Sequence, residues 1–60
     1  MSRYTRYEVV ADVSPDPLVV RYARVEHRGR SEWRTKRTAE KHAREYRATH
    51  LRDAWVNPIW

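Results

Sequence analysis

Apolar and polar positions alternate in the first part of the chain, with the period of a β-strand. Within residues 4–13 the odd positions from Tyr7 to Val13 are apolar, whereas charged side chains occupy most of the even ones. Because successive side chains of a strand point to opposite faces of a sheet, this pattern predicts a strand with one buried face. Residues 14–17, Ser-Pro-Asp-Pro, then predict a turn, since neither proline can donate to a β-ladder.

A second strand is predicted over residues 18–27, although its apolar positions are divided between two faces. A β-bulge near residues 21–24 would reconcile the two faces, and so would a strand that is buried on both sides at one end. Gly29 is the single glycine of the chain and is predicted to take a positive φ in a tight turn. A short third strand is expected over residues 30–35, with Trp33 facing the core.

A helix is predicted over residues 36–49. Thr35 is its expected N-cap, because a threonine hydroxyl accepts a hydrogen bond from an N–H of the first helical turn. One stripe of the 3.6-residue period consists of Ala39, Ala43, Tyr46 and His50. Since two of these residues are alanines, we expect the helix to lie close against a sheet. The opposite side of the helix carries Arg37, Lys41 and Arg44.

The C-terminal segment, residues 54–60, is largely apolar and predicts either a short fourth strand or an extended tail laid across the sheet. Pro58 would restrict such a strand to the edge of the sheet or end it early. In both cases the aromatic and branched side chains should pack on this domain or on a partner. The predicted fold is α+β with two layers: a three-stranded antiparallel sheet packed on one helix (β-β-β-α), with the C-terminal segment favoured as a fourth strand.

Length and composition restrict the class of protein. Sixty residues form one domain at most, so we treat residues 1–60 as a single small domain. The chain has no cysteine, which excludes disulfides and a cysteine-based zinc site. No apolar run approaches the ~20 residues of a membrane span, and the N-terminus lacks the apolar core of a signal peptide. We therefore expect a soluble, cytoplasmic protein without membrane contact.

The net charge of +5 is concentrated in one part of the chain. Residues 21–37 contain seven Arg and Lys against two Glu, which gives +5 for this segment alone. A concentrated basic element favours a polyanionic partner, although a solvated Arg-rich surface that confers solubility is an equally simple reading. The candidate nucleic-acid-binding residues are Arg24, Arg28, Arg30, Arg34, Lys36 and Arg37.

Catalytic and metal-binding patterns are weak in this sequence. The three serines lie in the N-terminal tail and in turns, and a single glycine cannot build a glycine-rich phosphate loop. His42 and His50 are more than two helical turns apart, too far for one metal ion to bridge. We interpret His42 as a partly buried helix residue and His50 as a C-terminal residue favoured by the helix dipole. The prediction is a non-enzymatic protein with no catalytic residues, no metal and no cofactor.

Several short motifs along residues 7–48 share one order, which is Arg21-Tyr22, Gly29, Trp33, Thr35-Lys36 and Ala39-Glu40. This order resembles the arm-type DNA-binding domain at the N-terminus of tyrosine integrases. The resemblance implies that the solvent face of the sheet enters the major groove, with Arg24, Arg28, Arg30 and Arg34 as the positions to consider.

The chain departs from that family after the helix. No catalytic domain follows, and residues 54–60 have no counterpart, so we expect a freestanding domain of similar shape rather than an integrase. Arg-rich, glycine-poor chains of this length also look like the small uncharacterised proteins of bacteriophages of high-GC bacteria, many of which act by binding a host protein.

Two functions follow from these patterns. The first is DNA binding through the Arg-rich hairpin, with phosphate contacts supplying most of the affinity. The alternative is a protein-interaction module, for example a phage-encoded modulator of a host protein or a small homodimer. It would use a sheet edge or the aromatic C-terminus, in particular Trp55, Ile59 and Trp60.

Overall fold

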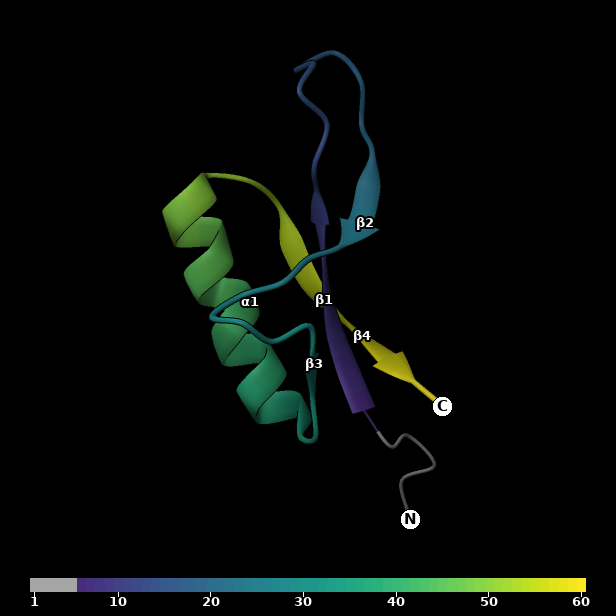
Figure 1. Ribbon diagram of the computed structural model, residues 1–60. Coiled ribbons are helices and arrows are strands. Elements are labelled where there is room, and N and C mark those ends of the chain that lie inside the picture. The colour runs from purple at the N-terminus through teal and green to yellow at the C-terminus, as the bar shows by residue number, and fades with distance from the viewer. Residues whose placement is uncertain (1–5) are drawn as a thin grey trace.

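The computed structural model describes residues 6–60, so the predicted start of the first strand at residues 4 and 5 lies outside the described part. The element order is β1 (Arg6–Asp12), β2 (Tyr22–Arg24), β3 (Glu32–Trp33), α1 (Lys36–His50) and β4 (Ala54–Ile59). An antiparallel sheet is covered on one face by α1, the one helix of the described residues (Figure 1). The predicted α+β class, with a fourth strand at the C-terminus, is confirmed.

The centre of the sheet is β1, which pairs with all three other strands. Along one edge it pairs with β4 over nearly its whole length, from Arg6 opposite Ile59 to Ala11 opposite Ala54. Along the other edge, β3 pairs with the first half of β1. On the same edge, β2 pairs with the last residues of β1. The C-terminal strand therefore lies beside the N-terminal one, and β2 and β3 share the opposite edge without forming a paired hairpin.

The core lies between the odd-numbered face of β1 and the small-residue stripe of α1. Its buried members are Val9, Ala11, Val25, Trp33, Ala39, Ala43, Tyr46 and Ala54. The alanines let the helix approach the sheet, and Trp33 fills the space at the β3 end. Full burial of a side chain such as Val9 contributes about 1.5–3 kcal/mol, a large fraction of the stability of a domain this small.

Both ends of α1 follow recognisable local rules. Thr35 has extended backbone angles, and its side chain accepts a hydrogen bond from the Thr38 N–H at 3.3 Å, which confirms the predicted N-cap. At the C-terminal end Leu51 adopts the left-handed conformation with φ 55° and donates its N–H to the Arg47 carbonyl at 2.9 Å. Glycine is the usual residue there, so Leu51 holds a conformation that costs about 1 kcal/mol.

The predicted second strand is mostly wrong. Only residues 22–24 of the predicted 18–27 pair with β1, because β1 ends at Asp12 and offers no ladder to the preceding residues. Side chain–backbone bonds organise the connection instead, and the Asp12 carboxylate accepts from the N–H groups of Ser14 and Arg21. Three consecutive exposed side chains, Leu18, Val19 and Val20, form what we call the apolar loop. Figure 1 shows this connection projecting beyond the C-terminal end of α1.

Three smaller predictions need correction. The third strand covers only residues 32–33 of the predicted 30–35. Val13, expected on the buried face, is 37 % exposed because the chain has left the sheet by this point. His50, expected on the buried helix stripe, is exposed in the last turn. The tight turn at Gly29 is confirmed, with φ 76° and a bridge between the two residues that flank it, His27 and Arg30.

Candidate functional site

Exposed cations line the outer side of α1. Arg37, Lys41 and Arg44 lie on the side opposite the buried stripe, and we call these three residues the cationic helix surface. Arg34, just before the N-cap, and Arg30, in the preceding turn, are also exposed. Within residues 6–60, none of the five forms an ion pair with a carboxylate.

The first turn of α1 contains no acidic residue, and it begins with Lys36 and Arg37. A helix N-terminus carries a partial positive charge, which acidic side chains normally offset. Cations at this end are unfavourable for the helix itself. They increase the positive potential outside it, so the beginning of α1 attracts anions.

The remaining predicted nucleic-acid-binding residues each have a carboxylate partner. Arg24 lies 3.6 Å from Glu8 and 3.8 Å from Glu32. Arg28 donates through Nε to Glu45 at 3.2 Å, and Lys36 is 4.0 Å from Glu40. The predicted set thus divides into paired cations (Arg24, Arg28, Lys36) and unpaired cations (Arg30, Arg34, Arg37).

The sheet face away from α1, which we call the open sheet face, carries a mixture of charges. It is formed by alternate positions of the paired strands, namely Arg6, Glu8, Val10, Asp12, Tyr22, Arg24, Glu32, Trp55, Asn57 and Ile59. Three of these ten residues are acidic and two are basic, so this face does not concentrate positive charge. Toward the C-terminal end of β1 this face is aromatic, because Tyr22 and Trp55 form a T-shaped pair with ring centroids 4.7 Å apart.

The residues predicted for the alternative, a protein interface, are divided among several environments. Trp55 is 41 % exposed on the open sheet face, Ile59 is half-buried in β4, and Trp60 is 74 % exposed beyond the strand. All three side chains of the apolar loop are exposed, and Leu18 is the most exposed of them at 92 %. Because the β-branched residues of this loop are typical of a strand, the pattern of residues 18–27 does not indicate an exposed apolar surface.

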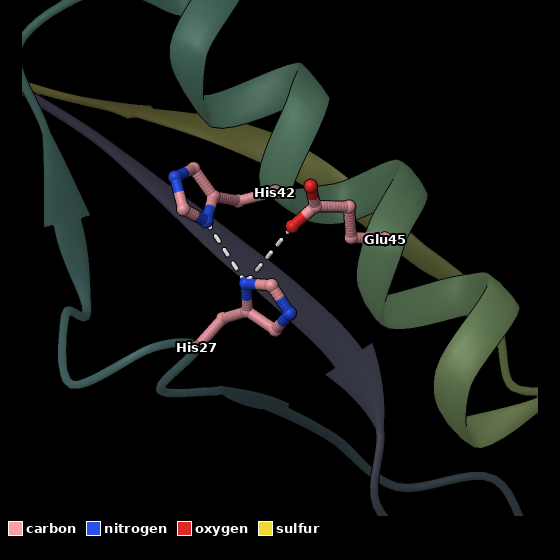
Figure 2. A group of neighbouring side chains, drawn as sticks. All are labelled: His27, His42 and Glu45. Atoms are coloured by element: carbon pink, nitrogen blue, oxygen red, sulfur yellow. Dashed lines mark hydrogen bonds and ion pairs between the residues drawn. The ribbon is translucent and has the colours of Figure 1, made fainter.

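A histidine cluster joins the turn before β3 to the middle of α1 (Figure 2). The Nδ1 atoms of His27 and His42 are 2.9 Å apart, and Glu45 Oε2 lies 3.8 Å from the His27 Nδ1. The His42 ring stacks on Trp33 with centroids 4.7 Å apart. Burial lowers the pKa of His42 below its ordinary value, and the neighbouring His27 lowers this pKa further. Each of the three residues contributes one possible metal-ligand atom, an imidazole nitrogen or a carboxylate oxygen, and these atoms lie within 4.8 Å of one another.

The spacing of His42 and His50 along the helix does not predict that His42 contacts His27. One signal was present, since His42 and Glu45 are three residues apart and share a helix face. His27, the third residue of the cluster, contacts His42 across 15 residues of sequence, and a local sequence pattern cannot predict such a contact.

A polar groove of about 620 Å³ lies between the turn at residues 14–17 and the C-terminal end of α1. The Arg52 guanidinium in this groove already donates to the carbonyls of Asp12 and Ser14. The hydrogen bond from the Ser14 N–H, opposed by partial burial, lowers the pKa of Asp12. These interactions hold the turn in place, so the polar groups that line the groove have a structural role.

Comparison with known proteins yields no match: no family model, no curated protein and no solved structure is similar to the chain. No helix within residues 6–60 is long and apolar enough to span a membrane.

Proposed function

We propose that this protein binds nucleic acid, in particular duplex DNA, through the cationic helix surface and the turn that precedes it. The observation that carries the proposal is that exposed cations of the helix and of the turn before it have no carboxylate partner in the described part of the chain, namely Arg30, Arg34, Arg37, Lys41 and Arg44. Cations already neutralised by an internal carboxylate contribute less to binding a polyanion, because that ion pair must first be broken.

The spacing of the helix residues suits a phosphate backbone. Arg37 and Arg44 are seven residues apart, which corresponds to about 10 Å along the helix axis. Lys41 lies between them on the same side. Arginine offers a planar fork of donors that matches phosphate geometry, and the positive end of the helix dipole adds to the attraction. Contacts of this kind position a protein on DNA without reading the base sequence.

The proposal places DNA on the helix rather than on the open sheet face that the integrase resemblance implies. On the open sheet face, Arg24 is held between two glutamates, and carboxylates outnumber guanidinium groups. A groove-binding sheet would bring those carboxylates close to phosphate. The repulsion between like charges therefore favours the helix side.

Salt-titrated fluorescence anisotropy with a random duplex tests the proposal. With four or five phosphate contacts, the log–log slope against salt should be about −4, and affinity should fall by about 10²-fold or more between 50 and 200 mM salt. The double variant Arg37→Gln/Arg44→Gln should bind more weakly and reduce the slope by about 2.

The matched control is Arg6→Gln/Arg24→Gln, which removes the same net charge from the open sheet face. Circular dichroism checks that both double variants fold. Selective weakening by the control pair would place DNA on the sheet and refute the helix surface as the contact. Absence of any salt dependence would refute nucleic-acid binding altogether.

The apolar loop supports a second candidate, a protein-interaction module that forms a homodimer. Leu18, Val19 and Val20 are 92 %, 52 % and 59 % exposed, and together they make a contiguous apolar stretch. Light scattering after size exclusion should give a dimer for the native chain and a monomer for Leu18→Ser/Val20→Ser. A native chain that remains monomeric at high concentration would remove this candidate.

A further inference from the structure

We propose that His27, His42 and Glu45 form a binding site for one divalent transition-metal ion, with Zn²⁺ as the best fit. The three side chains converge from the turn before β3 and from one face of α1 (Figure 2). Two imidazole nitrogens and one carboxylate oxygen are a donor set that zinc uses in proteins, normally with water in the fourth position. This inference is independent of DNA binding.

The two distances measured from His27 Nδ1 agree with a shared ion. An ion about 2.0–2.1 Å from both Nδ1 atoms would see them at roughly 90° across their present separation of 2.9 Å. Tetrahedral geometry would place the two nitrogens about 3.3 Å apart, so the rings need to separate by only about 0.4 Å. The 3.8 Å between His27 Nδ1 and Glu45 Oε2 corresponds to an angle of roughly 130° at the ion.

The surrounding structure holds these ligands before any ion arrives. His42 and Glu45 are three residues apart on α1, so they project from the same side of the helix. His27 is held by its backbone bridge to Arg30 across the tight turn. The His42 ring is fixed by stacking on Trp33. An ion would therefore bind without ordering a flexible segment, which lowers the entropic cost of binding.

The protonation states also favour an ion. The two Nδ1 atoms face each other, so without an ion one of them must carry a proton and donate it to the other. When a metal ion takes this place, the proton moves to Nε2 of the same ring, and both Nδ1 lone pairs are free to coordinate the ion. The competing interaction is the ion pair between Arg28 and Glu45. The Arg28 side chain is 71 % exposed, so its guanidinium can return to water.

Isothermal titration calorimetry with ZnCl₂ on the untagged chain at pH 7.5 tests the proposal. We expect one ion per chain, and at least a tenfold loss of affinity in His27→Gln, His42→Gln and Glu45→Gln. His50→Gln is the matched control, because this histidine lies on the same helix but is exposed and outside the cluster. Its zinc affinity should equal that of the native chain.

A direct measurement covers the case in which a variant fails to fold. Titration of the native chain with Co²⁺ should produce the visible absorption of a low-symmetry, four- or five-coordinate site. Imidazole NMR of the zinc-loaded chain should show two histidines coordinated through Nδ1. Failure to bind zinc at 1 mM, a loss of binding in His50→Gln, or coordination through a single histidine would each overturn the proposal.

Discussion

Replacement of Val9 by alanine tests whether the packing between β1 and α1 determines the stability of this domain. Val9 is completely buried, lies opposite Val56 in the sheet, and accepts the Val25 N–H at its carbonyl. The substitution removes two methyl groups, worth about 1.6 kcal/mol of transfer free energy, and leaves a small cavity. Together these terms predict a loss of about 2–3 kcal/mol in the free energy of unfolding.

That loss is large for this chain. A 60-residue domain is expected to have a free energy of unfolding of about 3–9 kcal/mol. Val9→Ala should therefore lower Tm by about 10–20 °C, and at the lower end of that stability range the variant would be partly unfolded at room temperature. Urea and thermal denaturation followed by far-ultraviolet circular dichroism measure both quantities.

The chain contains its own control for this experiment. Val19→Ala makes the same chemical change in the apolar loop, where the side chain is 52 % exposed. Its effect on the free energy of unfolding should stay within about 0.5 kcal/mol. Equal losses in the two variants, or a loss below about 0.5 kcal/mol for Val9→Ala, would refute the assignment of the core.

Three further predictions concern the helix and its ends. The pKa of His42 is lowered in the folded state, so the free energy of unfolding should be highest above the ordinary pKa of 6.5 and should decrease as pH falls toward the folded pKa. Urea denaturation between pH 8 and 5 in EDTA measures this decrease, and His42→Gln should make it smaller. Thr35→Ala should cost about 1 kcal/mol through loss of the N-cap, whereas Thr35→Ser should preserve most of it in the same denaturation assay. Leu51→Gly should raise stability by about 0.5–1 kcal/mol by relieving the left-handed conformation. Leu18→Gly, at an exposed position without positive φ, should not raise it.

The elements that sequence predicted well are those whose signal is local. The N-cap at Thr35 and the spacing of Ala39 and Ala43 determine where α1 begins and which side it buries, and neither needs information from elsewhere in the chain. The prediction of a strand at residues 18–27 was mostly wrong because a strand depends on a distant part of the chain. Its β-branched residues fit a strand, but strand formation depends on a neighbour to pair with, and β1 ends before it can serve as one.

The candidate sites divide in the same way. Sequence identified every cation of the basic segment, but it could not show which of them are neutralised. Arg28 meets Glu45 across 17 residues, and Arg24 meets a glutamate of β1. Such pairings depend on the sheet order and on the distance of the helix from the turn. The contact between His27 and His42 has the same origin, which is why the histidine cluster was not predicted.

Glu45 is the residue at which the two proposals can be separated. It lies on the helix that carries the cationic surface, it pairs with Arg28, and it is the carboxylate of the proposed metal site. Glu45→Gln removes a negative charge and releases Arg28, so DNA affinity in metal-free buffer should rise. The same substitution should lower zinc affinity at least tenfold, because an amide is a much poorer ligand. A general loss of structure would lower both affinities together. A rise in DNA affinity with a fall in zinc affinity would therefore show that the fold is intact, that the carboxylate opposes DNA binding and that it supports zinc binding.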